Sequence, residues 1–137
     1  MGKAIKNFIL ESEATMEQHD WGTLRWVSNP TVQDATQITS LVVHLPASKG
    51  HDFHLHPTQE EVIFVLDGSI EQWVGKEKHI LNAGDSVFIP ANTVHASFQI
   101  GEKEAKLLAT LGPCSDNEVG YDIQDMSTES PWSTIRD

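Results

Sequence analysis

The sequence predicts an all-β domain (a sandwich, jelly roll or barrel), because short apolar segments recur along it with turn residues between them. The segments are rich in Val, Ile, Leu, Phe, Trp or Thr, and they cover residues 23–27, 37–45, 53–56, 61–66, 69–74, 78–81, 86–89, 95–99 and 106–111. Turn-forming residues separate them, as at Asn29-Pro30 and Lys49-Gly50. No helical period of 3.6 residues runs through the middle of the chain, so strands are the predicted element.

The turn at Asp67-Gly68 carries a more specific prediction. Glycine adopts the positive φ that tight hairpin turns need, and apolar segments lie directly on both sides. We therefore expect a β-hairpin between residues 61–66 and 69–74.

A single domain accounts for this chain of 137 residues. Residues 1–20 are expected to form a short helix, or an arm that adds a strand to a neighbour. Residues 21–112 form the predicted barrel. Residues 113–137 are rich in Pro, Ser, Asp and Glu but retain Tyr121 and Trp132, and plain disordered tails seldom carry such aromatics. We expect an extended segment that packs on the barrel or on a partner subunit.

The composition disfavours two classes of partner. The formal net charge is −11 and there is no basic cluster, so binding to nucleic acid or to an anionic membrane is not expected. The single cysteine, Cys114, fits a reducing compartment, and the first 20 residues lack the apolar core of a signal peptide. No apolar segment approaches the roughly 20 residues that span a bilayer. These features predict a cytoplasmic protein.

A histidine-rich segment is the main functional signal. Side chains alternate along a strand, so His54 and His56 are expected on one face. Pro57 ends that strand, and Glu61 begins the next one. On an antiparallel neighbour, a carboxylate just past the turn can face the two imidazoles. Two nitrogens and one oxygen are a ligand set that several divalent metals accept. His95, which follows a second pair of turns, is a further candidate that spacing alone does not place.

These segments resemble the two sequence motifs of the cupin superfamily, over roughly residues 42 to 111. The first motif is read as His54, His56, Glu61 and Gly68, and the second as Gly84, Pro90, Asn92, His95 and Gln99. Three positions depart from the motifs: Asn92 stands for a glycine, Gln99 stands for an asparagine, and the leading glycine would fall at Ser48. Asparagine tolerates a positive φ, so the turn at Asn92 is still expected. The chain is similar to small single-domain cupins of the conserved-barrel type, including uncharacterised cupin-domain proteins.

The resemblance implies a double-stranded β-helix (jelly-roll) barrel that holds one divalent metal ion through His54, His56, Glu61 and His95. Fe, Mn, Ni, Cu, Co and Zn are all candidates. Glu60 directly precedes Glu61, and the motif spacing to Gly68 favours Glu61. Such a site leaves coordination positions open, unlike a closed structural zinc site. The resemblance also implies a homodimer.

Three functions remain open for such a site. The first is a small-molecule dioxygenase, an oxidoreductase in which Glu61 either stays bound or swings away to act as the catalytic base. The second is a non-redox isomerase or lyase that uses the metal as a Lewis acid. The third is a cupin that binds a small molecule without turnover. Whether the protein is an enzyme is left open, although the first function is slightly favoured.

Several other residues receive weaker predictions. His51 is expected at the surface or the site entrance, with a supporting or acid–base role at the pocket mouth as the alternative. Gln72 and Gln99 either line the pocket or face outward. Four aromatic residues are expected to pack in the core rather than to stack on a cofactor: Phe53, Phe64, Trp73 and Phe88. Because strands alternate, some of them must line the pocket and some the outside, and the sequence does not say which. His19, His44 and His79 are expected to be ordinary surface or hydrogen-bonded histidines, and Cys114 a spectator.

Overall fold

We analysed a computed structural model that describes residues 6–115 and 120–136. Parts of the predicted N-terminal arm (residues 1–5) and C-terminal segment (residues 116–119 and 137) lie outside the described residues. The strands are β1 (Met16–His19), β2 (Gly22–Ser28), β3 (Thr39–Leu45), β4 (Gly50–Leu55), β5 (Glu60–Asp67), β6 (Ser69–Val74), β7 (Glu77–Asn82), β8 (Ser86–Ile89), β9 (His95–Ile100), β10 (Ala105–Gly112) and β11 (Gln124–Asp125). A 3₁₀ turn (Glu11–Glu13) and the short helix α1 (Pro30–Gln33) complete the elements. Within the described residues, no helix has the length and apolar character that crossing a membrane requires.

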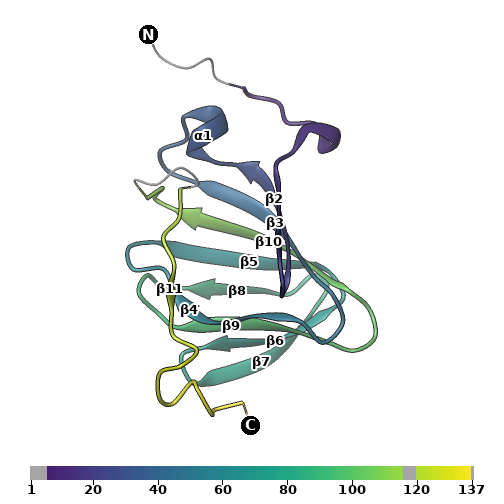
Figure 1. Ribbon diagram of the computed structural model, residues 1–137, viewed down its shortest axis with the longest axis vertical. Helices are drawn as coiled ribbons and strands as arrows, with labels where there is room; N and C mark the ends of the chain where they lie inside the picture. The colour runs from purple at the N-terminus through teal and green to yellow at the C-terminus, as the bar shows by residue number, and fades with distance from the viewer. Residues whose placement is uncertain (1–5, 116–119, 137) are drawn as a thin grey trace.

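The strands form two antiparallel sheets that face each other (Figure 1). Sheet A has the order β1-β2-β3-β10-β5-β8, and sheet B has the order β11-β4-β9-β6-β7. From β3 to β10 the chain alternates between the sheets at every connection except β6 to β7. This alternation is the double-stranded β-helix that the sequence motifs imply. Strands β2 to β10 each overlap one of the segments predicted from the sequence.

The predicted hairpin at Asp67-Gly68 is wrong, because β5 lies in sheet A and β6 in sheet B. Gly68 does have a positive φ, of 76°. A Cβ atom there would lie 2.6 Å from the backbone oxygen of Glu104, so a glycine is required by close approach as well as by conformation. The turn carries the chain from one sheet to the other. The hairpin forms one strand later, where Val74 pairs with Glu77.

Asn92 confirms the predicted tolerance for a missing glycine, with a φ of 59°. Ser48, the other position where the cupin motifs have glycine, has a φ of 67°, which the sequence did not predict. The Ser48 N–H donates a hydrogen bond of 2.7 Å to Oε1 of Gln99, which holds this strained turn in place.

Both chain ends pack on the same barrel. Strand β1 pairs with β2 of its own chain, with Met16 opposite Arg25. Strand β11 pairs with β4, and Figure 1 shows the C-terminal segment continuing from it along the molecule. Three apolar residues of this segment, Met126, Trp132 and Ile135, pack on a cluster of sheet B that includes Phe53 and Trp73.

Alternation along the strands separates the inner from the outer face of sheet A. Its inner face carries most of the main core, including Leu24, Leu41, Leu107 and Leu111. Phe53 and Trp73 are buried in the second cluster, as expected. Phe64 and Phe88 are the two that face the outside: they are 39% and 53% exposed, since their strand positions point outward from sheet A.

Candidate metal centre

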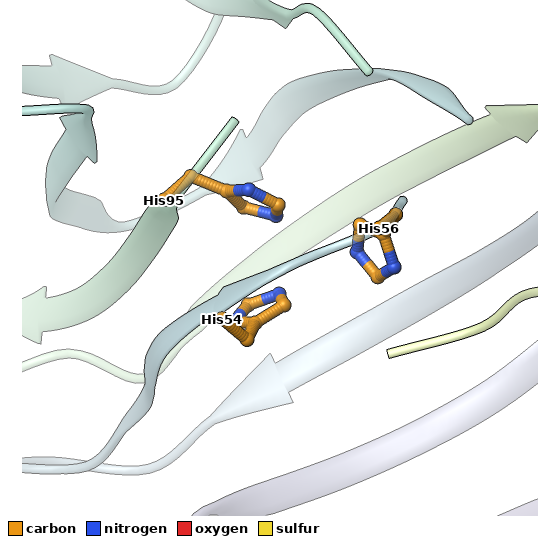
Figure 2. A group of neighbouring side chains, drawn as sticks. All are labelled: His54, His56 and His95. Atoms are coloured by element: carbon orange, nitrogen blue, oxygen red, sulfur yellow. The ribbon is translucent and has the colours of Figure 1, made fainter. Parts of the chain in front are cut away.

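Three buried histidines of sheet B come together inside the barrel (Figure 2). His54 lies in β4, His56 follows directly after that strand, and His95 is the first residue of β9. His54 and His95 are direct cross-strand partners. One nitrogen from each ring lies within 4.8 Å of the other two. The structure therefore brings together His54 and His56, predicted from strand alternation, with His95, which only the family resemblance placed beside them.

Backbone carbonyls set the tautomer of each imidazole. Nδ1 of His54 lies 2.7 Å from the carbonyl oxygen of Asp52, and Nδ1 of His95 lies 2.9 Å from that of Thr93. Nδ1 of His56 lies 2.7 Å from the carbonyl oxygen of Asp122. A carbonyl oxygen only accepts, so each Nδ1 must donate its proton. Each Nε2 is then left with a free lone pair, as a metal ligand requires.

Glu61 reaches the same point from sheet A. Its Oε1 lies 3.0 Å from Nε2 of His95 and 3.3 Å from Nε2 of His56. These contacts are short but are not aligned as hydrogen bonds. Glu61 Oε1 and His95 Nε2 are therefore buried atoms with no hydrogen-bond partner in the described part of the chain. Buried polar atoms are rarely left without a partner. The donor set, three imidazoles and one carboxylate, fits a divalent transition metal.

Glu61 lies on a strand of a different sheet from the one that the sequence predicted. The sequence predicted that its strand would neighbour the histidine strand, but β5 lies in sheet A and faces β4 across the barrel interior. Pro57 ends the hydrogen-bonded strand, and the chain then crosses to the other sheet. The two adjacent carboxylates differ in burial: Glu61 is buried, whereas Glu60 is exposed on the outer side.

The local environment keeps these ligands deprotonated. Burial raises the pKa of Glu61, but the imidazoles of His56 and His95 outweigh burial and lower it to about 2. Burial and the neighbouring histidines hold the pKa of His54 well below its ordinary value. Metal ligands must be deprotonated, so neither group needs to lose a proton before a metal binds at neutral pH.

The C-terminal segment supports the centre through Gln59. This fully buried side chain donates hydrogen bonds to the carbonyl oxygens of Pro113 (2.7 Å) and Gly120 (2.6 Å), and it accepts one from the N–H of Asp122 (3.1 Å). Asp122 in turn supplies the carbonyl that orients His56. Sequence reasoning missed both residues, because a glutamine in a turn and an aspartate in an irregular segment carry no local signal for this contact.

A small cavity opens beside the ligands. Its empty volume is about 320 Å³, which includes some open solvent. It is lined by three candidate ligands, His54, His56 and Glu61, together with Trp21, Leu24, Leu41, Val43, His51, Ala109, Leu111 and Tyr121. Burial raises the pKa of Tyr121 to about 12, so its hydroxyl stays protonated. The ring of Tyr121 packs edge-on against His56 at 5.5 Å.

His51 lies at the mouth of this cavity. The pairing of β4 with β9 shifts register between His51 and His54, so a bulge brings both side chains to the same side. Their rings stack at 3.8 Å, and Trp21 stacks on the other face of His51 at 4.0 Å. Burial lowers the pKa of His51 to about 3. An outer hollow of about 900 Å³, including open solvent, adjoins it.

The remaining candidate residues lie apart from the ligands. Gln72 is buried and accepts a hydrogen bond of 2.6 Å from Ser97. Gln99 is buried and donates to the carbonyl oxygens of Ile100, Gly101 and Lys103. The Cys114 thiol donates to the carbonyl oxygen of Ile38, and burial raises its pKa. None of these three side chains is among those that line the cavity.

Comparison with known proteins identifies the family. The cupin domain family matches residues 41–111. Protein SchB of Streptomyces halstedii is 31% identical over 117 residues, covering 83% of this chain and 84% of that protein. Quercetin 2,3-dioxygenase of Bacillus subtilis is 33% identical over 60 residues, which are 44% of this chain and 18% of that protein. The structure of KdgF from Halomonas sp. superposes with a TM-score of 0.71 at 18% identity, covering 81% of this chain and 96% of that one. The chain belongs to the cupin domain family.

Proposed function

We propose that this cupin holds one divalent transition metal through His54, His56, His95 and Glu61, and uses it as a dioxygenase on a small organic molecule. The observation that carries the proposal is the matched orientation of the three imidazoles. Three separate backbone carbonyls fix three Nδ1 protons, so three Nε2 lone pairs converge beside a buried carboxylate. Histidines that only filled the barrel interior with polar groups would not require the same tautomer in all three rings.

The open cavity supports chemistry or ligand binding rather than a structural metal. A structural zinc site is closed by four protein ligands, whereas this site borders an accessible space. A redox-active metal such as Fe or Cu, when bound, would supply the site for dioxygen and for an oxygen atom of the substrate. The walls of the barrel hold the substrate and exclude bulk water from the reacting groups.

Glu61 is the proposed catalytic residue. Its low pKa keeps it ionised as a ligand, and among the residues that the structure describes it is the only acidic side chain that lines the inner cavity. If it leaves the metal when substrate binds, it also leaves the contacts with His56 and His95 that lower its pKa, and it becomes a base within reach of a substrate hydroxyl. The similarity to quercetin 2,3-dioxygenase supports oxygen chemistry for this site, over less than half of the chain.

Oxygen uptake by the metal-loaded protein tests this proposal. The protein is loaded with Fe(II) or with Cu(II), and quercetin and simpler enols are added in an oxygen electrode, with His95→Ala as the control. Uptake that depends on both the enol and His95 supports a dioxygenase. Product formation without oxygen, with Zn or Mn, would instead establish a non-redox isomerase or lyase. Tight binding without any product would leave a binding protein.

We also propose that the protein is a cytoplasmic homodimer. The outer face of sheet A supports the dimer, because four large apolar side chains are exposed there: Val62, Phe64, Leu66 and Phe88. Light scattering on the wild type and on Phe64→Glu tests this face, and a dimer that persists in the variant would contradict it. The free thiol of Cys114 supports a reducing compartment.

A further inference from the structure

The chemistry of the cavity walls bears on the substrate. The three wall strands of sheet A that face the ligands present only aliphatic side chains to the cavity: Leu24, Leu41, Val43, Ala109 and Leu111. All five are buried. An uncharged, weakly polar group is stabilised against such a wall, whereas a charged group loses its hydration there without compensation.

The described residues provide no positive side chain for a substrate anion. Neither Lys nor Arg is among the residues that line the inner cavity or the outer hollow. The described cations that form ion pairs do so elsewhere, as Arg136 does with Glu71 and Lys103 does with Asp67. The outer hollow carries two carboxylates instead, Asp52 and Asp125. A polyanionic substrate would meet repulsion on its way in and no cation at its end.

The charge balance at the centre also favours a ligand with a single negative charge. A divalent cation held by three neutral imidazoles and one carboxylate keeps a single positive charge. A ligand with one ionised oxygen neutralises that charge. A ligand with two ionised groups would leave a net negative charge against aliphatic walls, which is costly when no partner is present.

We infer that the substrate is a monoanionic enol or phenol with an apolar body, and that dicarboxylates and sugar acids are excluded. This inference rests on the proposed metal site and deepens it. The ionised oxygen belongs at the His54, His56, His95 and Glu61 centre, and the apolar body lies against the aliphatic wall of sheet A. The part of the body nearest the metal lies in the inner cavity, and the rest extends past Trp21 and His51 into the outer hollow.

Binding of two probe ligands to the full chain loaded with Co(II) tests this inference. Tropolone chelates as a monoanion with a flat ring, and oxalate chelates as a dianion with no apolar body. Each affinity, measured by absorption titration without oxygen, is divided by the affinity of the same ligand for Co(II) held by nitrilotriacetate. The normalised affinity for tropolone is expected to exceed that for oxalate at least tenfold. Equal values, or a preference for oxalate, would overturn the inference.

A charge placed at the cavity mouth provides a second test. Trp21 is only partly buried, so Trp21→Arg adds a cation beside the site with little demand on the core, and Trp21→Gln is the neutral control. The arginine variant is expected to shift the normalised preference toward oxalate at least fivefold relative to the glutamine variant, and no shift would contradict the inference. Metal content is measured on every sample. A wild type without bound Co(II) refutes the metal site and this inference together, whereas a loaded protein that prefers oxalate refutes this inference alone.

Discussion

The two inner walls of the barrel face each other but differ in chemistry. Sheet B presents polar side chains to the interior, among them His54, His95, Ser97 and Gln72, while sheet A presents a mostly aliphatic surface that is interrupted by Trp26 and Glu61. Both walls are built from strands with the same alternation. The difference shows that one wall positions ligands and the other supplies most of the buried apolar area. The following predictions separate these two contributions, from the largest expected effect to the smallest.

Truncating the aliphatic wall should lower stability and leave the metal site intact. Leu107 is 2% exposed, lies in the main core and does not line the cavity. Leu107→Ala is expected to lower the free energy of unfolding by about 2–5 kcal/mol, since it removes buried methyl groups and leaves a void. Urea denaturation measures the loss, and elemental analysis should find unchanged metal content. Leu108→Ala, one residue along and facing outward, is the matched control and should cost much less.

Removing the charge of Glu61 should lower the metal affinity, which Leu107→Ala is expected to leave unchanged. Glu61→Gln keeps the shape of the side chain but replaces an anionic ligand, so metal affinity is expected to fall by about 100-fold or more, beyond the range typical of a supporting residue. The metal-free variant should be less stable than the wild type at neutral pH, because the contacts with His56 and His95 that lower the pKa of Glu61 stabilise its charged form in the folded state. Competition with a chromogenic chelator measures the affinity. Glu60→Gln is the control, and an equal loss in both variants would contradict the assignment of Glu61.

Loosening the C-terminal segment should weaken the metal site indirectly. Gln59→Leu removes the hydrogen bonds to Pro113, Gly120 and Asp122, so the carbonyl that orients His56 is no longer held. Metal affinity is expected to fall by about 10–100-fold, as for other residues that support a ligand. Gln99→Leu is a matched control, because Gln99 is also a buried glutamine that fastens a loop by hydrogen bonds, but away from the ligands. A purely structural role for Gln59 would make both variants unstable and neither deficient in metal.

Acidification should destabilise the metal-free protein through its buried histidines. The pKa of His51 is lowered to about 3, and that of His54 is also lowered, relative to 6.5 in the unfolded chain. Between these limits the unfolded state binds protons that the folded state does not, so stability falls as the pH drops below about 6.5, by at most about 1.4 kcal/mol per pH unit for each group. Urea denaturation between pH 7 and 4.5 measures this slope. His51→Asn should reduce it, with the exposed His79→Asn as control, and an unchanged slope in His51→Asn would contradict the effect.

Local spacing predicted the parts of the centre that depend on one strand. His54 and His56 share a face because strand side chains alternate, and Pro57 ends their strand. Glu61 was chosen over its neighbour from motif spacing, and burial agrees with that choice. His95 needed the family resemblance, since nothing local indicates that β9 pairs with β4.

Contacts between distant segments were not predictable in this way. A bulge in β4 turns His51 toward His54, and such an extra residue leaves no mark in the alternating pattern. The Asp67-Gly68 turn has the composition of a hairpin, but it joins two sheets because Gly68 approaches the backbone of Glu104. The sequence does not say which of Phe53, Phe64, Trp73 and Phe88 face outward, and only the register places Phe64 and Phe88 on the outer face of sheet A.

The metal content of protein purified without a metal-affinity tag tests the central claim most directly. Wild type and the His54→Ala/His56→Ala variant are compared by elemental analysis, as isolated and after exposure to Fe, Mn, Ni, Cu, Co and Zn. The account predicts about one of these ions per wild-type chain and none in the variant. A folded wild type that takes up none of them, or a variant that retains its metal, would contradict the proposed centre.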